Sequence, residues 1–456
     1  MAKRVPPLAE KLNDDLGPLL LGMLSMRGRR AFFPSAGILG QSAEAKGSTI
    51  NATIGTAFEE DESPLCMACV TDLVSLPPTA FLYAPSSGVP EIRKMWADMM
   101  RAKNPSLAGK AFSLPVVTSA LTHGLSIVGA LFLDEHERII LPDLFWDNYE
   151  LVFEETYGAR LQVYQTFTKN GEFNIDGLDR MLMGKRQKRV ILLNFPNNPT
   201  GYTPTFEEEQ AICAALLKAA EEGKKLVVIL DDAYFGLVYE QGVCTESLFA
   251  KLADLHPNIL AIKLDGPTKE DYVWGARVGF ITFGIKDATP EQYAALEMKA
   301  AGIVRSTISN VSSIGQHLLL KAYASEHYVN QREEKYETLK RRYEHIRAIF
   351  RDHPEYDRSF IPMPFNSGYF MCVRIRSGID PEMIRKLLLE KGIGVIVLSG
   401  LIRIAFSTVS CEKLGPLFAV MHTIVQEIKA QLEEQEAKKE KKAKKAKKPK
   451  KIRRFG

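Results

Sequence analysis

Short apolar runs alternate with amphipathic stretches through the middle of the chain, between about residues 112 and 283. The apolar runs have the length and the Val, Ile and Leu content of buried strands. We predict strands at Phe112–Thr118, Arg138–Pro142, Arg160–Tyr164, Arg189–Phe195, Leu226–Leu230, Ile259–Leu264 and Val278–Phe283. We predict helices at His123–Asp134, Asp147–Tyr157, Ile175–Met183, Phe206–Glu222 and Thr245–Leu255. This alternation predicts an α/β fold with a mostly parallel sheet of seven strands and helices on both faces.

The pattern changes after residue 310. A long helix, rich in Glu, Lys, Arg and Tyr, is predicted from Asn310 to about Asp352. Predicted strands at Gly368–Ile375 and Gly394–Ile404 flank a predicted helix, Pro381–Lys391, which indicates a second, smaller α+β domain. We therefore divide the chain into an arm with part of the small domain (1–72), a large domain (73–309), an interdomain helix with the small domain (310–436) and a Lys-rich tail (437–456).

The charge is distributed unevenly. The tail holds 12 Lys or Arg and one Glu, a charge of +11, while the whole chain carries +4, so the remainder carries −7. A mildly acidic body does not favour a nucleic-acid-binding fold, and only weak contact through the tail is expected. We expect the tail to be disordered or a frayed helix, because its composition is of low complexity.

No apolar run approaches the roughly 18 residues that a membrane helix needs, and residues 1–7 lack the apolar core of a signal peptide. Six cysteines in 456 residues do not form a disulfide scaffold. We therefore expect a cytoplasmic protein without membrane association. The pair in Cys66-Met67-Ala68-Cys69 has no second pair beside it, so we interpret it as structural and expect no metal site.

Three polar residues follow three of the predicted strands. Asn198 comes shortly after Arg189–Phe195, Asp231 directly after Leu226–Leu230, and Lys269 shortly after Ile259–Leu264. Ligands of an open parallel sheet bind outside the carboxyl ends of its strands. We therefore expect these side chains, distant in sequence, to converge on one cleft.

The residue types around this cleft suit pyridoxal phosphate. Lys269 can form an imine if its pKa is lowered by burial, and Asp231 can hold the pyridinium nitrogen. Arg277, eight residues after Lys269, can grip the phosphate with a fork of donors. Tyr234 and Asn198 can each donate a hydrogen bond to the phenolic oxygen of the ring. Further candidates are Thr268 and Thr122 as hydroxyl donors to the phosphate and Trp146, which either stacks on the ring or belongs to the core.

Together these motifs resemble the fold-type I pyridoxal-phosphate enzymes of the class I/II aminotransferase family, nearest to the aspartate and aromatic branch. The resemblance runs from about Asn51 to Cys411. It rests on Asn197-Asn198-Pro199-Thr200-Gly201, Asp231-x-Ala233-Tyr234, Lys269 with Arg277, and Leu141-Pro142-x-x-x-Trp146-x-Asn148. It implies the fold of that class and the same cofactor contacts as those assigned above. Two departures are Gly266-Pro267-Thr268-Lys269, which lacks one hydroxyl of the family motif, and Leu121 in the phosphate loop.

Three further roles are implied by the resemblance alone. The segment that begins at Tyr83 is similar to the one whose tyrosine reaches the phosphate of the neighbouring subunit, which implies a homodimer with shared sites. Arg403 matches the arginine that binds the substrate α-carboxylate. Arg305 lies in a segment similar to the one that supplies a partner-subunit arginine for a distal carboxylate, which suggests glutamate or another dicarboxylate, unless Arg305 only forms an interface salt bridge.

The leading hypothesis is an aminotransferase that moves an amino group from an L-amino acid to a 2-oxo acid, with 2-oxoglutarate and glutamate as one pair, by a ping-pong mechanism. In this hypothesis Lys269 both holds the cofactor and transfers the proton. A β-lyase or decarboxylase on the same scaffold is the alternative, because fold and cofactor do not separate these reactions. A third hypothesis is a binding protein without catalysis that uses its basic tail.

Overall fold

The computed structural model describes residues 5–24, 26–32, 37–71, 75–376 and 378–446. Its largest sheet has seven strands in the order β2-β8-β7-β6-β5-β3-β4. The strands are β2 (Val116–Thr118), β3 (Arg138–Pro142), β4 (Arg160–Tyr164), β5 (Lys188–Asn194), β6 (Lys225–Asp231), β7 (Ile259–Asp265) and β8 (Gly279–Gly284). Only β8 runs antiparallel to its neighbours β7 and β2. The predicted mostly parallel sheet of seven strands is confirmed.

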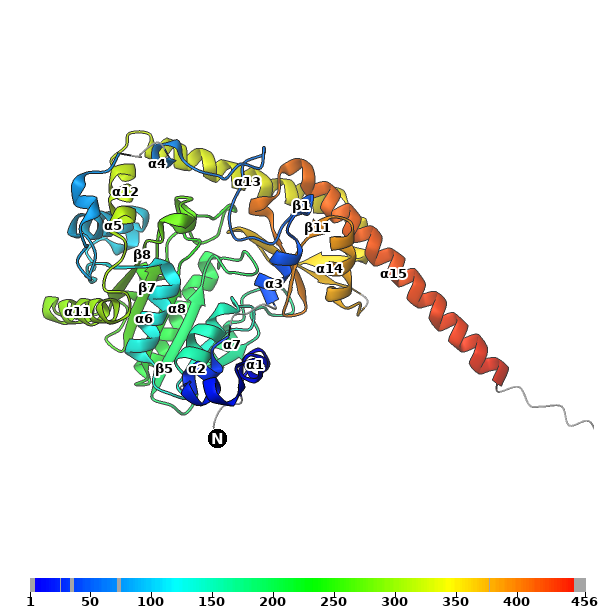
Figure 1. The fold of residues 1–456 in the computed structure, drawn as a ribbon, viewed down its shortest axis with the longest axis horizontal. Coiled ribbons are helices and arrows are strands. Elements are labelled where there is room, and N and C mark those ends of the chain that lie inside the picture. The colour runs from blue at the N-terminus through cyan, green and yellow to red at the C-terminus, as the bar shows by residue number, and fades with distance from the viewer. Residues whose placement is uncertain (1–4, 25, 33–36, 72–74, 377, 447–456) are drawn as a thin grey trace, which may run out of the picture.

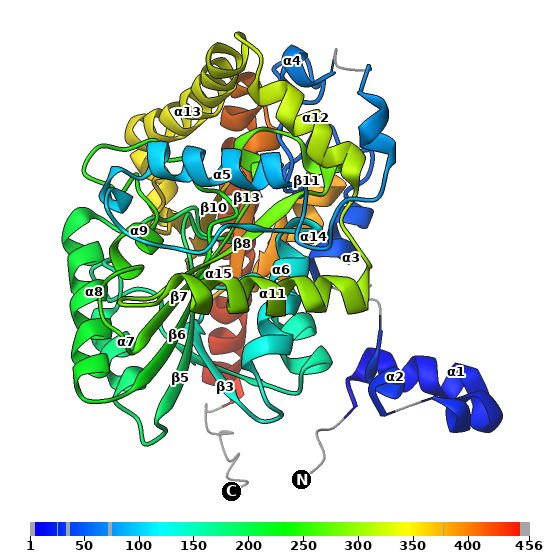
Figure 2. The ribbon, with the colours of Figure 1, turned by 90° about the vertical axis from the view of Figure 1, so that its left-hand side faces the viewer.

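Helices lie on both sides of this sheet (Figure 1, Figure 2). They include α5 (Pro90–Lys103), α6 (Ala120–Phe132), α7 (Ile175–Leu182), α8 (Phe206–Glu221), α9 (Leu248–Leu252) and α11 (Pro290–Thr307). The start of α8 is fixed by a capping box, in which Thr205 and Glu208 satisfy each other's backbone N–H groups. The central strands carry side chains that are buried on both faces, as a doubly covered sheet requires.

Three of the predicted helices differ from the structure. α6 begins at Ala120, three residues before the predicted start, so Leu121 and Thr122 belong to its first turn. The stretch predicted as Asp147–Tyr157 is a π-helix, Glu150–Thr156. The single helix predicted from residue 310 to 352 is two helices, α12 (Ser313–Tyr323) and α13 (Tyr328–Asp352), because the chain turns at Ser325.

The smaller unit is a four-stranded antiparallel sheet in the order β12-β13-β10-β9. Its elements are β9 (Phe360–Pro362), β10 (Phe370–Ile375), β12 (Ile396–Leu398), β13 (Leu401–Ala405) and the helix α14 (Pro381–Glu390). The stretch Gly394–Ile404, predicted as one strand, is instead a hairpin. Ser399 and Gly400, both with positive φ, make its two-residue turn between β12 and β13.

The N-terminal region joins both units. It contains α1 (Pro7–Met23), α2 (Met26–Arg30), α3 (Gly37–Glu44), β1 (Ile50–Asn51) and α4 (Ala68–Thr71). β1 pairs in parallel with β11 (Ile393–Gly394), next to the small sheet. Residues 50–51 are therefore attached to the small unit.

The C-terminal helix α15 (Cys411–Ala446) packs against α13 and α14 with its first half and then projects away from the body (Figure 1). The described part of the Lys-rich tail, residues 437–446, is thus helical, and residues 447–456 lie outside the described residues. Among the helices in the described ranges, none combines the length and apolar character needed to cross a membrane.

Candidate active site

A cavity of about 390 Å³ opens at the carboxyl ends of β5, β6 and β7. Ten of the twelve residues predicted for the site line it: Leu121, Thr122, Trp146, Asn198, Asp231, Tyr234, Thr268, Lys269, Arg277 and Arg403. They come from seven segments of the chain, separated by up to about 280 residues of sequence. The strand topology therefore brings together what the sequence placed at separate strand ends.

Lys269 lies in α10 (Pro267–Glu270), directly after β7, and is half-buried between the buried Thr268 and Glu270. Burial lowers the pKa of Lys269 to about 8, with Arg277 acting in the same direction and Asp231 opposing both. Its Nζ lies 5.1 Å from the centre of the Tyr234 ring. A large neutral fraction at neutral to mildly basic pH is what a lysine needs in order to attack a carbonyl carbon.

Asp231 is the last residue of β6 and is buried. The hydroxyl of Tyr149 donates a hydrogen bond of 2.6 Å to its Oδ2, and the N–H of Ala233 donates one of 3.2 Å to its Oδ1. Burial raises the pKa of Asp231, while the bond from Tyr149 and the charge of Lys269 oppose that shift. The carboxylate is thus held in one orientation at the inner end of the cavity.

Asn198 and Arg403 meet on the opposite wall. Arg403 Nη1 donates a hydrogen bond of 3.1 Å to Asn198 Oδ1, and Arg403 Nη2 donates one of 3.0 Å to the carbonyl of Thr53. The guanidinium carbon lies 4.4 Å from the centre of the Phe370 ring. Within the described residues, Nε of Arg403 has no hydrogen-bond partner although it is buried. The Arg403 guanidinium is thus fixed in place, and its Nε–H can still donate a hydrogen bond.

The loop that carries Asn198 approaches the small sheet closely. Gly201 has a φ of +73°, and a Cβ atom there would lie 1.9 Å from the carbonyl oxygen of Phe370. Only glycine tolerates both conditions. The glycine of the Asn-Asn-Pro-Thr-Gly motif therefore allows the loop to pack onto β10, which pairs with the strand of Arg403.

One corner of the cavity has the features of an anion site. Leu121 and Thr122 lie in the first turn of the 13-residue helix α6, where backbone N–H groups have no helical partner. Arg277 reaches the same cavity from a left-handed backbone conformation with φ of 52°. Oγ1 of Thr268 is buried and finds no hydrogen-bond partner among the described residues. These donors fit a phosphate group.

Two predicted residues do not line the cavity. Tyr83 is 93% exposed. Arg305 lies in the last turn of α11, where its Nη1 donates a hydrogen bond of 2.7 Å to Ser309 Oγ at an exposed position. Both positions suit a contribution to a neighbouring subunit, and that role stays a prediction.

Sequence reasoning missed three groups of residues at this site. Tyr149 and Asn194 brace the predicted residues, since Asn194 Oδ1 accepts a hydrogen bond of 2.8 Å from the N–H of Asn198. Ile38, Leu39 and Ser42 of α3 line the mouth of the cavity, as do Thr53, Ile54 and Gly55. The spacing Trp146-x-x-Tyr149, one turn of a helix, is the only local signal that pointed to any of them.

Asp147 connects the arm to this site. Its carboxylate accepts a hydrogen bond from the backbone of Ile38 at the start of α3. Burial raises the pKa of Asp147, and the charge of Arg403 opposes the shift. The residue beside Trp146 therefore helps to hold α3 over the cavity, together with Gln41, which exchanges two hydrogen bonds with the backbone of Val397.

A sequence profile described as "Aminotransferase class I and II" matches residues 61–419, which is most of the chain. The chain belongs to the class I and II aminotransferase family. The profile spans both structural units and every residue that the sequence placed in the cavity. The family resemblance inferred from the motifs is thereby confirmed.

Curated relatives are distant. The chain is similar to a probable aspartate/prephenate aminotransferase of Aquifex aeolicus, with 26% identity over 254 residues, 55% of this chain and 59% of the relative. It is also similar to the aspartate aminotransferase of Bacillus subtilis, with 24% identity over 241 residues, 53% of this chain and 56% of the relative. The matched part thus spans a little more than half the length of these relatives.

Solved structures show the same fold across nearly their whole length. An aminotransferase from Anaerococcus prevotii superposes with a TM-score of 0.78 and 23% identity, covering 88% of this chain and 99% of that one. The aspartate aminotransferase of Thermus thermophilus with maleate gives a TM-score of 0.68 and 18% identity, with the same coverage of 88% and 99%. At these identities the likeness shows the fold, a fold-type I architecture.

Proposed function

We propose that this family member is a pyridoxal-phosphate-dependent aminotransferase that moves an amino group between an L-amino acid and a 2-oxo acid. The observation that carries the proposal is the pair formed by Lys269 and Asp231. Asp231 is buried, Lys269 is half-buried, both line one cavity, and an anion cradle lies at one end of that cavity. The distribution of an amine, a carboxylate and phosphate donors matches the functional groups of the cofactor.

The unpartnered donors of the site support the fit. Thr268 Oγ1, the N–H groups at the start of α6 and the Arg277 guanidinium would hold the phosphate. Asp231, braced by Tyr149, would hold the ring nitrogen. Asn198 and Tyr234 would contact the phenolic oxygen, and Trp146 would cover a face of the ring.

When bound, pyridoxal phosphate supplies an aldehyde that condenses with amines and a protonated ring that withdraws electrons from the substrate α-carbon. Lys269 is the base that the chain contributes. Its lowered pKa leaves Nζ able to accept a proton from the α-carbon of the substrate. The same amine could then donate that proton to the cofactor. Ile38, Leu39 and Trp146 cover the mouth and restrict the access of water.

Arg403 would orient the substrate by binding its α-carboxylate through the free Nε edge. We propose 2-oxoglutarate and glutamate as one substrate pair, with Arg305 of the partner subunit binding the distal carboxylate. This role of Arg305 requires a homodimer, in which Tyr83 of the partner subunit would reach the phosphate. The exposure of both side chains supports that arrangement. A cytoplasmic location stays a prediction.

The test is a half-reaction. Purified protein loaded with pyridoxal phosphate is mixed with glutamate and other amino acids, without a second oxo acid, and the visible absorbance is followed. Bleaching of the band with release of one 2-oxo acid per site is expected. Release of ammonia with pyruvate, or of carbon dioxide, would instead favour the lyase or decarboxylase alternative. No reaction with any amino acid would contradict the proposal.

A further inference from the structure

A lysine and two aspartates form a buried cluster directly behind the candidate site. Lys263, in the middle of β7, is fully buried, and its amine contacts the carboxylate of Asp232. The same amine lies 3.3 Å from Oδ2 of Asp265. We call Lys263, Asp232 and Asp265 the Lys263 network.

Neutral donors complete the network. Ser247 Oγ donates a hydrogen bond of 2.5 Å to Asp232 Oδ2, and Trp96 Nε1 donates one of 3.0 Å to Asp265 Oδ1. The amine of Lys263 also lies 4.6 Å from the centre of the Phe235 ring. Each carboxylate thus has one cationic and one neutral donor, which is how ionised groups are kept in a protein interior.

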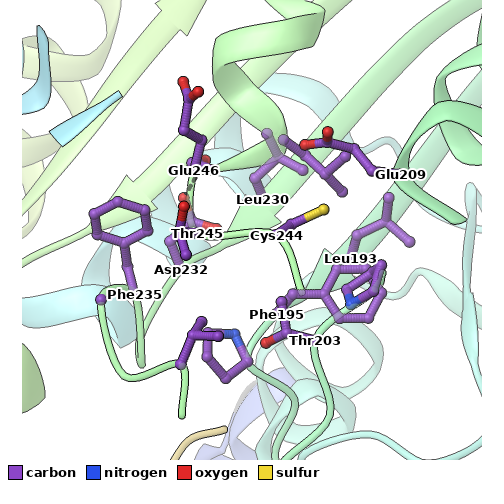
Figure 3. Close-up of a pocket in the computed structure, with 16 residues that line it drawn as sticks. Leu193, Phe195, Thr203, Glu209, Leu230, Asp232, Phe235, Cys244, Thr245 and Glu246 are labelled. Carbon is purple, nitrogen blue, oxygen red and sulfur yellow. Dashed lines mark hydrogen bonds between the residues drawn. The ribbon is translucent and has the colours of Figure 1, made fainter. Parts of the chain in front are cut away.

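The network lies back to back with the cofactor cavity. Asp231 and Asp232 are consecutive, so their side chains leave the strand on opposite sides. Asp231 lines the large cavity, whereas Asp232 lines a separate, small cavity of about 20 Å³, shown in Figure 3. Asp265, at the end of the next strand, precedes Lys269 by four residues. The two strand ends that carry Asp231 and Lys269 therefore also carry the network.

The network has a net charge of −1 when both carboxylates are ionised, because it contains one amine and two carboxylates. Burial raises the pKa of Asp265, while the charge of Lys263 and the hydrogen bond from Trp96 oppose that rise. Both carboxylates raise the pKa of Lys263 and outweigh the opposing effect of its burial, so the lysine stays charged. Lys263 cannot cancel more than one of the two negative charges. A buried charge is screened little by solvent and acts over longer distances than a surface charge.

The surrounding charges do not cancel this remainder. Glu270 is paired with Lys103 at 2.6 Å and with Arg332 at 3.1 Å, and the charge of Lys103 also acts on Asp271. The two cations and the two ionised acids sum to zero. Asp271 accepts hydrogen bonds of 2.8 Å from Tyr323 and Tyr328.

Two acids line the small cavity on its other walls. Glu246 accepts hydrogen bonds from the backbone and hydroxyl of Ser106. Burial raises the pKa of Glu209, near which Lys251 lies. On the cofactor side, Asp231 is bonded to Tyr149 and faces Lys269. Arg277 is the cation that lowers the pKa of Lys269 from within the cofactor cavity, and the proposed function assigns its charge to the phosphate.

We propose that Asp232 and Asp265 are positioning residues whose buried net negative charge, held in place by Lys263, stabilises a proton on Nζ of Lys269 when the cofactor is joined to it. This inference rests on the proposed function. Asp231 already stabilises a proton on Nζ from the cavity side. In the proposal the network adds a second source of negative potential from behind, and the charge of Asp232 already acts on the neighbouring Asp231, whose pKa it raises. It would thereby shift the working pH range of the site to more basic values.

The experiment uses the full chain loaded with pyridoxal phosphate and measures the pH midpoint at which its visible band changes position. Asp232→Asn keeps the shape and leaves Lys263 paired with Asp265. We expect it to lower the midpoint by about half a pH unit to one pH unit, and Asp265→Asn to lower it as well. Asp232→Glu should keep the midpoint of the original protein.

Asp179→Asn is the matched control, since it removes one carboxylate from an exposed ion pair with Lys218 and should leave the midpoint unchanged. A purely structural network would lower the melting temperature in Asp232→Asn and Asp265→Asn without moving the midpoint, and that result would overturn the inference. Should Asp232→Asn not fold, Asp265→Asn decides alone. Failure of the proposed function is distinct, because the unsubstituted protein would then show no visible band.

Discussion

The hydroxyl of Tyr149 lies 2.6 Å from Oδ2 of Asp231, and both side chains are buried beside the cofactor cavity. Burial raises the pKa of Asp231, and this hydrogen bond is the first of the contacts that oppose the rise. The tyrosine therefore helps to keep Asp231 ionised, the state in which it holds a protonated ring nitrogen.

Tyr149→Phe removes only that hydroxyl. We expect the affinity for pyridoxal phosphate to weaken by about tenfold, because a hydrogen bond to a charged group is lost in a buried place. Titration of the cofactor-free protein, followed by absorbance, measures this. Tyr164→Phe is a matched control: Tyr164 is buried, but its hydroxyl has no partner in the described chain, so its removal should leave the affinity unchanged. Equal affinity in both variants would contradict the assigned role of Tyr149.

Lys269 makes the stability of the cofactor-free protein depend on pH. Its pKa falls from 10.5 in the unfolded chain to about 8 in the folded protein, so the unfolded state binds more protons between these values. The resulting penalty is fully present below pH 8 and is lost as the pH approaches 10.5. We expect Lys269→Met to increase the free energy of unfolding at pH 7 by about 3 kcal/mol, and by much less near pH 10.5.

Urea unfolding of both proteins at the two pH values measures the difference. The same variant should lose the visible band of the loaded protein while its far-UV spectrum is retained. A gain in stability that is equal at both pH values would show that the amine is not destabilised by burial.

Much of this site was predictable from sequence because its signals are local. Apolar runs marked the strands, and Asp231 and Lys269 follow two of them. Tyr149 gave no such signal, since a tyrosine in an amphipathic stretch is usually a core residue and its partner lies 82 positions away. Leu39 likewise reaches the cavity through the tertiary docking of α3 on Asp147 and on Val397 of β12.

Prediction from the local pattern failed where tertiary contacts or backbone conformation override that pattern. The apolar stretch of residues 394–404 looks continuous, but positive φ at Ser399 and Gly400 folds it into a hairpin. Lys263 interrupts an apolar run with a charge. One of its carboxylate partners, Asp265, is two residues away, but the other, Asp232, lies 31 positions away at the end of the neighbouring strand. Such long-range pairing has no counterpart in periodicity.

Arg305 separates dicarboxylic from other substrates if it acts in a neighbouring subunit. We expect Arg305→Ala to lower kcat/KM for glutamate by about 100-fold through the loss of a charge-assisted pair, with kcat/KM for alanine changed little. Lys299→Ala, on the same helix α11 and also away from the cavity, serves as the control. An equal loss for both amino acids would mean that Arg305 supports the interface rather than the substrate.

The Lys-rich end of α15 should be dispensable for catalysis. The last buried residue of this helix is Ile428, and the described side chains beyond Gln431 are exposed, including the ion pair of Lys438 with Glu434. Truncation after Glu436 therefore leaves every buried residue of the described part of α15 in place, and turnover and melting temperature should stay unchanged. The truncation removes a charge of +11, so retention on immobilised heparin should fall sharply. Truncation before Ile424 is the contrasting variant, because it also removes the buried Val425 and should destabilise the fold. If the truncation after Glu436 already abolished turnover, the basic tail would take part in the reaction or in assembly of the site.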